Sequence, residues 1–304
     1  MDVQPMASGD LSGEVNYEPV LRLRAIDDRL AELGEAGSIG FLPRAAGREA
    51  ALVGTVAALN KGDWIFPTMA DWAISIARGM ALETFAHRIF GDARDPLRGH
   101  DIPAGTCAKS LNIASASAPA ATHLPHAVGV SWAARQRGEQ SIAAALFDGP
   151  EVDAAEFHTA LNFAGVMKTP TLFICRVRPG EEGAVEHAVA YGLASAHCDG
   201  SDLAAVIETV AAAAERARSG GGSTVIDLEL GGPDDAVEIA IAAVGREREG
   251  QIEGEAHQAL SSALESASKT ASPDLRSLFD DVYSGFENHL AEQLQEARQE
   301  AEDQ

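Results

Sequence analysis

The stretch IAAALFDGP at residues 142–150 decides the fold class. Its first six residues, Ile142 to Phe147, are all apolar, and Asp148-Gly149-Pro150 ends the run with a turn. Helical spacing follows from Asp153 to Val166, and a second buried strand is predicted from Thr171 to Arg176. Short, almost wholly apolar strands that alternate with helices are typical of a parallel sheet covered on both faces.

More helices and a third strand are predicted around this stretch. We expect the third strand at Thr224 to Leu230, near an edge of the sheet, because Asp227 and Glu229 alternate along it. The fold class is therefore α/β, a three-layer parallel sheet covered by helices. Apolar spacing predicts helices at residues 17–37, 45–59, 82–90, 123–137 and 203–219, and one ending at residues 78–79.

Composition excludes several classes of protein. No apolar run approaches the ~20 residues of a membrane helix. The polar N-terminus lacks the basic flank and apolar stretch of a signal peptide, so we do not expect secretion. The three cysteines (Cys107, Cys175 and Cys198) lack the spacing of a zinc site or a disulfide framework, which favours a reducing, cytoplasmic location.

The charge balance is strongly acidic. Asp and Glu number 46 against 23 Lys and Arg, which gives a net charge of −23. Such a chain repels nucleic acid. A disordered acidic chain is one explanation, but apolar periodicity along most of the length opposes it. We therefore predict a halophilic protein, because at ~1 M salt the screening length falls to ~3 Å and the carboxylates no longer repel one another.

Short motifs between Leu21 and Leu230 resemble one family. Together they are similar to the alpha subunit of the thiamine-diphosphate-dependent 2-oxo acid dehydrogenases, the first component of the pyruvate and branched-chain dehydrogenase complexes. The resemblance covers about two thirds of the 304 residues. The matching motifs are Leu21-Arg-Leu-Arg24, Gly47-Arg-Glu-Ala50, Gly62-Asp-Trp-Ile-Phe-Pro-Thr68, Ala77-Arg-Gly79, Gly99-His-Asp-Ile-Pro103, Lys109-Ser-Leu-Asn112, Ala120-Ala-Thr-His-Leu-Pro125, Glu156-Phe-His158, Ala160-Leu-Asn162, Lys168-Thr-Pro170, Ala190-Tyr-Gly192 and Asp199-Gly-Ser-Asp202.

The resemblance implies a cofactor, a reaction and a partner. The cofactor would be thiamine diphosphate with Mg²⁺, and the reaction oxidative decarboxylation of a 2-oxo acid with acyl transfer to lipoamide. A beta-type subunit would supply the Glu that activates the thiamine ring, and two copies of each subunit would form a heterotetramer. Asp148 and Gly149 stand at the family's Gly-Asp-Gly, so the resemblance makes both cofactor-binding candidates and Asp148 the metal ligand.

Several positions depart from the family's cofactor motifs. The paired Asn of the metal site falls at Val177-Arg178, and the Tyr-Arg that holds the diphosphate falls at Met69-Ala70. Further departures are Trp72, His100, Gly105 and Pro233-Asp234. Three functions therefore stay open: a working alpha-like subunit, a catalytically degenerate structural or regulatory paralogue that binds a beta-type subunit or itself, and a site for a different anion.

Five side chains near the predicted strands have alternative interpretations. Asp148 either holds Mg²⁺ beneath a phosphate, since Mg²⁺ prefers oxygen ligands, or caps the helix that follows. Arg176 and Arg178 either bind phosphate or pair with carboxylates in this acidic chain. His123 and His126 would need partners such as His100 or His158 for a catalytic or metal role, and otherwise are structural.

The C-terminal part differs from the rest. Ser272-Pro273-Asp274 predicts a helix start, and Phe279 and Phe286 are the expected anchors of a subunit interface on that helix. The expected domains are an acidic tail at 1–16, the α/β domain at 17–232 and a helical extension at 233–304. The predicted apolar face consists of Leu275, Leu278, Phe279, Val282, Phe286, Leu290 and Leu294.

We predict that thermal stability rises steeply with salt. Between ~0.1 M KCl, where charges interact over ~10 Å, and multimolar KCl, screening removes the repulsion among carboxylates. Melting curves followed by circular dichroism across this range test the prediction. A melting temperature that does not change with salt would contradict the halophilic interpretation.

Overall fold

Five parallel strands form one sheet, which carries the site described below. The computed structural model describes residues 15–102, 105, 107–116, 119–280 and 282–302. The sheet order is β1-β2-β3-β5-β4, and every neighbouring pair is parallel. The strands are β1 (Trp64–Phe66), β2 (Ala143–Asp148), β3 (Thr171–Val177), β4 (Ala194–Asp199) and β5 (Thr224–Glu229).

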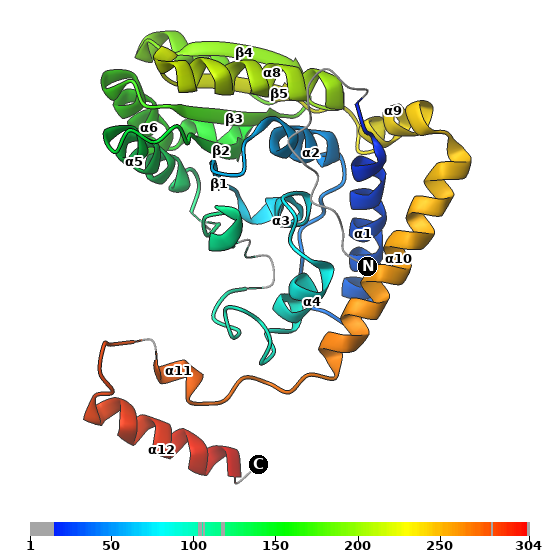
Figure 1. The fold of residues 1–304 in the computed structure, drawn as a ribbon, viewed down its shortest axis with the longest axis vertical. Coiled ribbons are helices and arrows are strands. Elements are labelled where there is room, and N and C mark those ends of the chain that lie inside the picture. Colours follow the sequence, from blue (N-terminus) through cyan, green and yellow to red (C-terminus); the bar gives the residue numbers. More distant parts are fainter. Residues whose placement is uncertain (1–14, 103–104, 106, 117–118, 281, 303–304) are drawn as a thin grey trace. The chain divides into compact units, whose positions relative to one another are not determined.

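Helices cover both faces of this sheet. The crossovers from β2 to β3 and from β3 to β4 run in one direction across the sheet, whereas β4 to β5 runs back. Right-handed crossovers therefore place α6 (Ala155–Met167) and α7 (Val185–Ala188) on one face and α8 (Leu203–Arg216) on the other. The predicted three-layer α/β class is confirmed, and α5 (His123–Gln136) lies beside α6 (Figure 1).

The side chains of β2 and β3 divide between the two faces. Ala145, Phe147 and Phe173 belong to an apolar cluster with α5 and α6. Asp148 and Arg176 alternate with these residues, so their side chains lie on the opposite face. Asp148 and Arg176 therefore lie on the same face of the sheet, at the carboxyl ends of β2 and β3.

The remaining elements of the first unit precede, connect or follow the strands. The chain divides into two compact units, of which the first comprises the described residues up to Ala81 and from 105 to Gln258. Its other elements are α1 (Glu18–Glu35), α2 (Glu49–Ala58), α3 (Ala73–Ala77), α9 (Asp235–Val244), the 3-10 turns η1 (Met69–Asp71), η2 (Lys109–Leu111), η3 (Gly149–Asp153) and η4 (Val189–Tyr191), and the π turn η5 (Ala217–Gly221). The helix α10 (Arg246–Ser268) begins in the first unit and ends in the second.

The prediction that Thr224–Leu230 lies near an edge is wrong. β5 is an interior strand between β3 and β4. Its Asp227 is buried because the carboxylate accepts hydrogen bonds from the backbone N–H groups of Ala184 (3.0 Å) and Val185 (3.2 Å). The edge strands are β1 and β4, and the sequence does not predict β4, because its residues alternate in burial and form no apolar run.

The second unit is wholly helical apart from its connections. It comprises α4 (Leu82–Phe90), the end of α10, α11 (Ser277–Asp280) and α12 (Asn288–Glu302). The predicted single helix from Ser272 to Leu294 is wrong: α11 and α12 are separate, with Gly285 between them. Leu290 and Leu294 are buried. The other five residues of the predicted face (Leu275, Leu278, Phe279, Val282 and Phe286) do not continue it, because α11 ends at Asp280.

The described residues include no helix with both the length and the apolar character that a membrane crossing requires. Of the predicted acidic tail, residues 1–14 lie outside the part of the chain that the structure describes.

Candidate functional site

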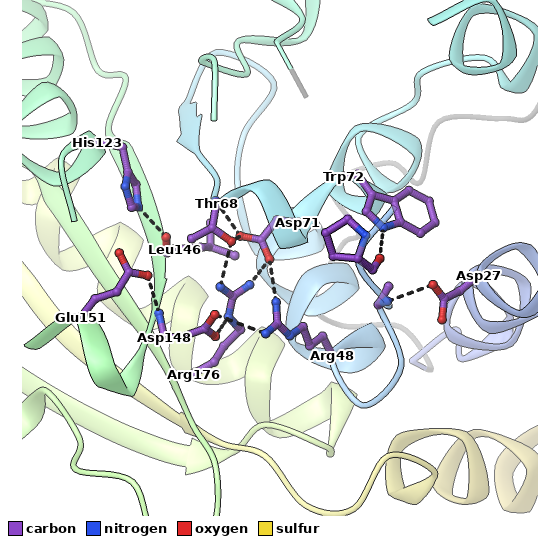
Figure 2. Close-up of polar contacts among 12 residues, drawn as sticks. Asp27, Arg48, Thr68, Asp71, Trp72, His123, Leu146, Asp148, Glu151 and Arg176 are labelled. Carbon is purple, nitrogen blue, oxygen red and sulfur yellow. Dashed lines mark hydrogen bonds and ion pairs between the residues drawn. The ribbon is translucent and has the colours of Figure 1, made fainter. Parts of the chain in front are cut away.

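Four charged side chains meet at the carboxyl ends of β2 and β3. Arg48 comes from the start of α2, Asp71 from η1, Asp148 from the end of β2 and Arg176 from β3 (Figure 2). Asp148 and Arg176 are register partners in neighbouring strands, so their side chains stand side by side on one face. The carboxyl end of a parallel sheet is where ligands bind in this class of fold.

The four side chains form one continuous ion-pair cluster. Arg176 donates from Nη1 to Asp71 Oδ1 and from Nε to Asp148 Oδ1, the latter at 2.9 Å. Arg48 donates from Nη2 to Asp148 Oδ2 at 3.2 Å, and its Nη1 lies 4.0 Å from Asp71 Oδ1. Each carboxylate therefore faces both guanidinium groups, and the two positive and two negative charges balance.

Short-range capping bonds hold the two carboxylates in place. Asp71 Oδ2 accepts from the backbone N–H of Thr68 at 2.8 Å and from its hydroxyl at 2.9 Å, which caps η1. The backbone N–H of Asp148 donates to Glu151 Oε1 at 3.0 Å. Glu151 in turn accepts from the backbone N–H of Ala121 at 2.6 Å, so the loop before α5 is tied to the end of β2. Asp148 thus caps the 3-10 turn η3 and not the helix α6, which begins after Ala154 without a side-chain cap.

Burial dominates the electrostatics of the cluster. The side chains of Arg176 and Asp71 are fully buried, and that of Arg48 is nearly so. Burial raises the pKa of Asp148 from its usual range, and the charges of Arg48 and Arg178 oppose that shift. Burial, followed by the charge of Arg48, lowers the pKa of the Arg176 guanidinium. Guanidinium groups nevertheless stay charged in proteins, so Arg176 requires its two carboxylate partners.

The loop at residues 178–184 covers the end of β2. A Cβ atom at Gly149 would stand 2.9 Å from the carbonyl oxygen of Glu182, so only glycine permits this approach. Gly183 similarly allows the Asp227 carboxylate to reach the loop, where it accepts the two backbone hydrogen bonds described above. The loop therefore brings both the Glu181 carboxylate and the Arg178 guanidinium group close enough to act on Asp148.

These residues do not fit Mg²⁺ with a diphosphate. The Asp148 carboxylate is used by Arg48 and Arg176, and a divalent cation there would stand beside two guanidinium groups. Val177 has no ligand atom in its side chain. Among the described residues, no group of three or more His, Cys, Asp or Glu side chains is placed to hold a metal ion. Asp148 and Gly149 as cofactor-binding residues, and Asp148 as the metal ligand, remain sequence-based predictions.

The predicted histidines of the first unit, His123, His126 and His158, do not share a contact within the residues that the structure describes. His123 is buried and shares a hydrogen bond of 2.7 Å from Nε2 with the carbonyl oxygen of Leu146, and burial lowers its pKa. His126 is exposed, and His158 contacts the Tyr191 hydroxyl at 2.9 Å. His100 belongs to the second unit, where its Nε2 lies 3.0 Å from the carbonyl oxygen of Ser277.

The sequence predicts only one member of this cluster as part of an ion pair. It allowed that Arg176 pairs with carboxylates, which is confirmed, whereas Arg178 is exposed. The sequence-based prediction did not include Arg48 and Asp71. A charged residue at the end of an otherwise apolar strand was the available signal, because a buried arginine demands a carboxylate from elsewhere in the chain.

Trp72 lies where the family has a histidine, and its role here is structural. The indole is buried, and its Nε1–H donates to the carbonyl oxygen of Pro43 at 2.7 Å (Figure 2). Together with Met69 and Ala70, it replaces polar family positions by groups that bind no phosphate.

Sequence comparison places this site in a known family. The profile of the family described as "Dehydrogenase E1 component" matches residues 17–230. The chain belongs to this family. The resemblance found from the motifs, to alpha subunits of the thiamine-diphosphate-dependent 2-oxo acid dehydrogenases, is thereby confirmed.

Relatives of this dehydrogenase E1 chain include alpha subunits of 2-oxoisovalerate dehydrogenases. The mitochondrial 2-oxoisovalerate dehydrogenase subunit alpha 2 of Arabidopsis thaliana is 29% identical, over 91% of this chain and 67% of the relative. The 2-oxoisovalerate dehydrogenase subunit alpha of Bacillus subtilis is 32% identical, over 69% of this chain and 68% of the relative. A solved thiamin diphosphate-dependent enzyme from Mycobacterium smegmatis has a TM-score of 0.41 at 14% identity, covering 64% of this chain and 33% of that one.

We predict that Arg176→Met lowers the free energy of unfolding by about 3–5 kcal/mol, because it removes the buried guanidinium group that pairs with the buried Asp71 and the half-buried Asp148. Arg29→Met is the matched control, since Arg29 pairs with Glu32 on the exposed surface of α1 and should cost less than about 1 kcal/mol. Denaturant unfolding at high salt, followed by circular dichroism, measures both. Equal losses of unfolding free energy for the two variants would contradict the prediction that the buried cluster stabilises the fold more than a surface ion pair does.

Proposed function

We propose that this chain is an alpha-like subunit of a thiamine-diphosphate-dependent 2-oxo acid dehydrogenase complex that has lost its own cofactor site. It would then serve as a structural or regulatory paralogue that binds a beta-type subunit or a second copy of itself. The observation that carries the proposal is the pairing of Asp148 with Arg176 and Arg48. The carboxylate that would bind the metal is neutralised by the protein's own cations.

The surroundings of Asp148 support the same proposal. Glu151 and Glu181 both raise the pKa of Asp148, which means that they place negative charge at this end of the sheet. A diphosphate carries further negative charge and would need cationic partners there. Arg176 is fully buried, and its two short contacts are both with carboxylates.

A working subunit is the alternative, and family membership supports it. In that case the complex would decarboxylate a 2-oxo acid and transfer the acyl group to lipoamide, as the resemblance implies. The names of the relatives point to 2-oxoisovalerate, a branched 2-oxo acid, as the substrate of those proteins. The alternative requires the loop at 178–184 and both arginines to move away from Asp148 when a partner and cofactor bind.

We also propose that the protein is located in the cytoplasm of a cell with a high internal salt concentration. All three cysteines are free thiols in the described structure, which is the usual state in a reducing compartment. The net charge of −23 supports a salt-rich interior.

We predict that the chain does not bind thiamine diphosphate tightly. Titration calorimetry with Mg²⁺ and thiamine diphosphate at high salt, with and without a co-expressed beta-type subunit, should give no low-micromolar dissociation constant. The reason is that Asp148 is engaged by arginines and that Ala70 stands where the family has a cation. Binding in the low-micromolar range that needs Mg²⁺ and disappears in Asp148→Ala would contradict the proposal.

A variant of the ion-pair cluster serves as the control for the calorimetric test. In Arg48→Gln, Asp148 keeps Arg176 as a partner but loses one of its two cations. If this variant gains Mg²⁺-dependent binding while the unmodified chain shows none, the ion pairs are what exclude the cofactor. Circular dichroism must first show that the variant is folded.

A further inference from the structure

Positively charged side chains lie at the edge of the sheet opposite the ion-pair cluster. Because every pair of neighbouring strands is parallel, all five strands begin at this edge. Lys or Arg residues stand shortly before β1, β2, β3 and β5, at the ends of the preceding helices or in the turns that follow them. We call these residues the amino-edge cations: Lys61, Arg135, Arg137, Lys168, Arg216 and Arg218.

The charge of this edge is opposite to that of the whole chain. The amino-edge cations lie in four short segments, residues 60–63, 135–140, 168–170 and 215–223. These segments contain three carboxylates, Asp63, Glu139 and Glu215, against the six cations, so their formal charge is +3 in a chain of −23. Asp63 is buried and already accepts from Nη1 of Arg218 at 2.7 Å.

Arg216 is exposed, but the glycine-rich loop that follows it holds its side chain in place. The Nη1 of Arg216 donates to the carbonyl oxygens of Gly222 at 3.1 Å and Ser223 at 3.3 Å. A Cβ atom at Gly221 would stand 2.6 Å from Cγ of Arg216, so the loop packs on this side chain only because glycine is there. Gly220 and Gly222 have φ values of +82° and +79°, which glycine adopts without strain.

Arg135, in the last turn of α5, is held in the same way by a neighbouring segment. Its Nη1 donates to the carbonyl oxygen of Lys168 at 2.6 Å. The Cβ position of Gly222 lies 3.9 Å from Cα of Lys168, so the carbonyl acceptors of Arg135 and Arg216 belong to adjacent segments. These hydrogen bonds join both guanidinium groups to uncharged oxygen atoms, so the bonds fix the two groups without neutralising them.

The helix dipole accounts for the position of these arginines in the sequence but not for how they are held. Arg135 and Arg216 lie in the last turns of α5 and α8, where a positive charge is favourable. That role requires charge near the helix end, but neither a fixed guanidinium group nor three consecutive glycines around it. A fixed guanidinium group loses less conformational entropy when it binds an anion, which is the usual advantage of a preorganised site.

We propose that the surface formed by Arg135, Lys168 and Arg216 binds a carboxylate-rich segment of another protein. A guanidinium group matches a carboxylate with two parallel hydrogen bonds, and cations on adjacent segments favour a ligand with several carboxylates. The acidic remainder of the surface repels such a segment and so directs it to this edge. A nucleic acid carries charge continuously and would extend over the surrounding carboxylates, whereas a short acidic segment needs only a few cations.

This proposal goes beyond the proposed function and does not depend on it, because Asp148 lies at the opposite edge of the sheet. Loss or retention of the cofactor site leaves the amino-edge cations unchanged. A calorimetric result that contradicts the proposed function would therefore not affect the acidic-segment proposal.

The test is binding of a fluorophore-labelled oligoglutamate to the full chain, followed by fluorescence anisotropy. It is carried out at the lowest KCl concentration at which circular dichroism shows a folded chain, and the affinity should fall as KCl rises. Arg135→Gln/Arg216→Gln should weaken binding by about tenfold or more, because two charge-assisted contacts are lost. The matched control is Arg29→Gln/Arg246→Gln, which changes the net charge equally at exposed arginines and should leave the affinity nearly unchanged.

Three results would overturn the proposal. The first is that the unmodified chain does not bind oligoglutamate, and the second is that both double variants lose affinity equally. The third is that tripolyphosphate or single-stranded DNA binds more tightly than oligoglutamate in competition, which would make phosphate the ligand. If Arg135→Gln/Arg216→Gln does not fold, Lys168→Gln replaces it, since this changes one exposed side chain and keeps the carbonyl oxygen that Arg135 uses.

Discussion

A fully buried arginine, Arg176, is the constraint on which this site depends. A guanidinium group in the interior costs several kcal/mol unless carboxylates surround it. Asp148 is supplied by the neighbouring strand at the same register, but Asp71 must come from a separate segment. The pairing therefore fixes η1 and the start of α3 against the carboxyl end of the sheet. Arg48 then balances the second carboxylate and joins α2 to the same cluster.

The same charges explain how a dehydrogenase E1 chain can keep its sheet while its cofactor motifs diverge. The carboxylates of Asp148, at the end of β2, and Asp71, on η1, need positive charge nearby, whether from a divalent cation or from a guanidinium group. In our proposal the arginines supply that charge permanently. The covering loop at 178–184 is held by Asp227 from β5, so the closed arrangement is connected to the interior of the sheet.

Ion pairing is also distributed unevenly over the first unit. Buried or half-buried arginines hold carboxylates between elements, as Arg24 does with Glu49 and Arg218 with Asp63. The excess of carboxylates lies on outward faces such as that of α1. By contrast, α5 contains no carboxylate and α6 contains only Glu156, and Trp132 and Phe163 are exposed on these helices.

The sequence by itself determined the local elements whose apolar pattern is strong. The strands around Ala145 and Phe173 and the helix at 82–90 follow from runs and spacings of a few residues, so local physics suffices. It failed where the pattern is weak: β4 has no apolar run, and α10 is rich in Glu and Ala. The apolar spacing also predicted one helix where α11 and α12 are separate. Spacing alone does not indicate that the helix is interrupted near Gly285.

Only the tertiary structure decided which charged groups meet. Asp71 and Arg176 are 105 residues apart, and nothing in the spacing of either residue indicates the other. The interior position of β5 depends on the order in which strands pair, and the burial of Asp227 depends on amide groups from a loop more than 40 residues earlier. Strand order and long-range ion pairs are set by the simultaneous burial of many segments. The sequence therefore identified the family and the helices and strands near the site, whereas the fold decided that Asp148 faces two arginines.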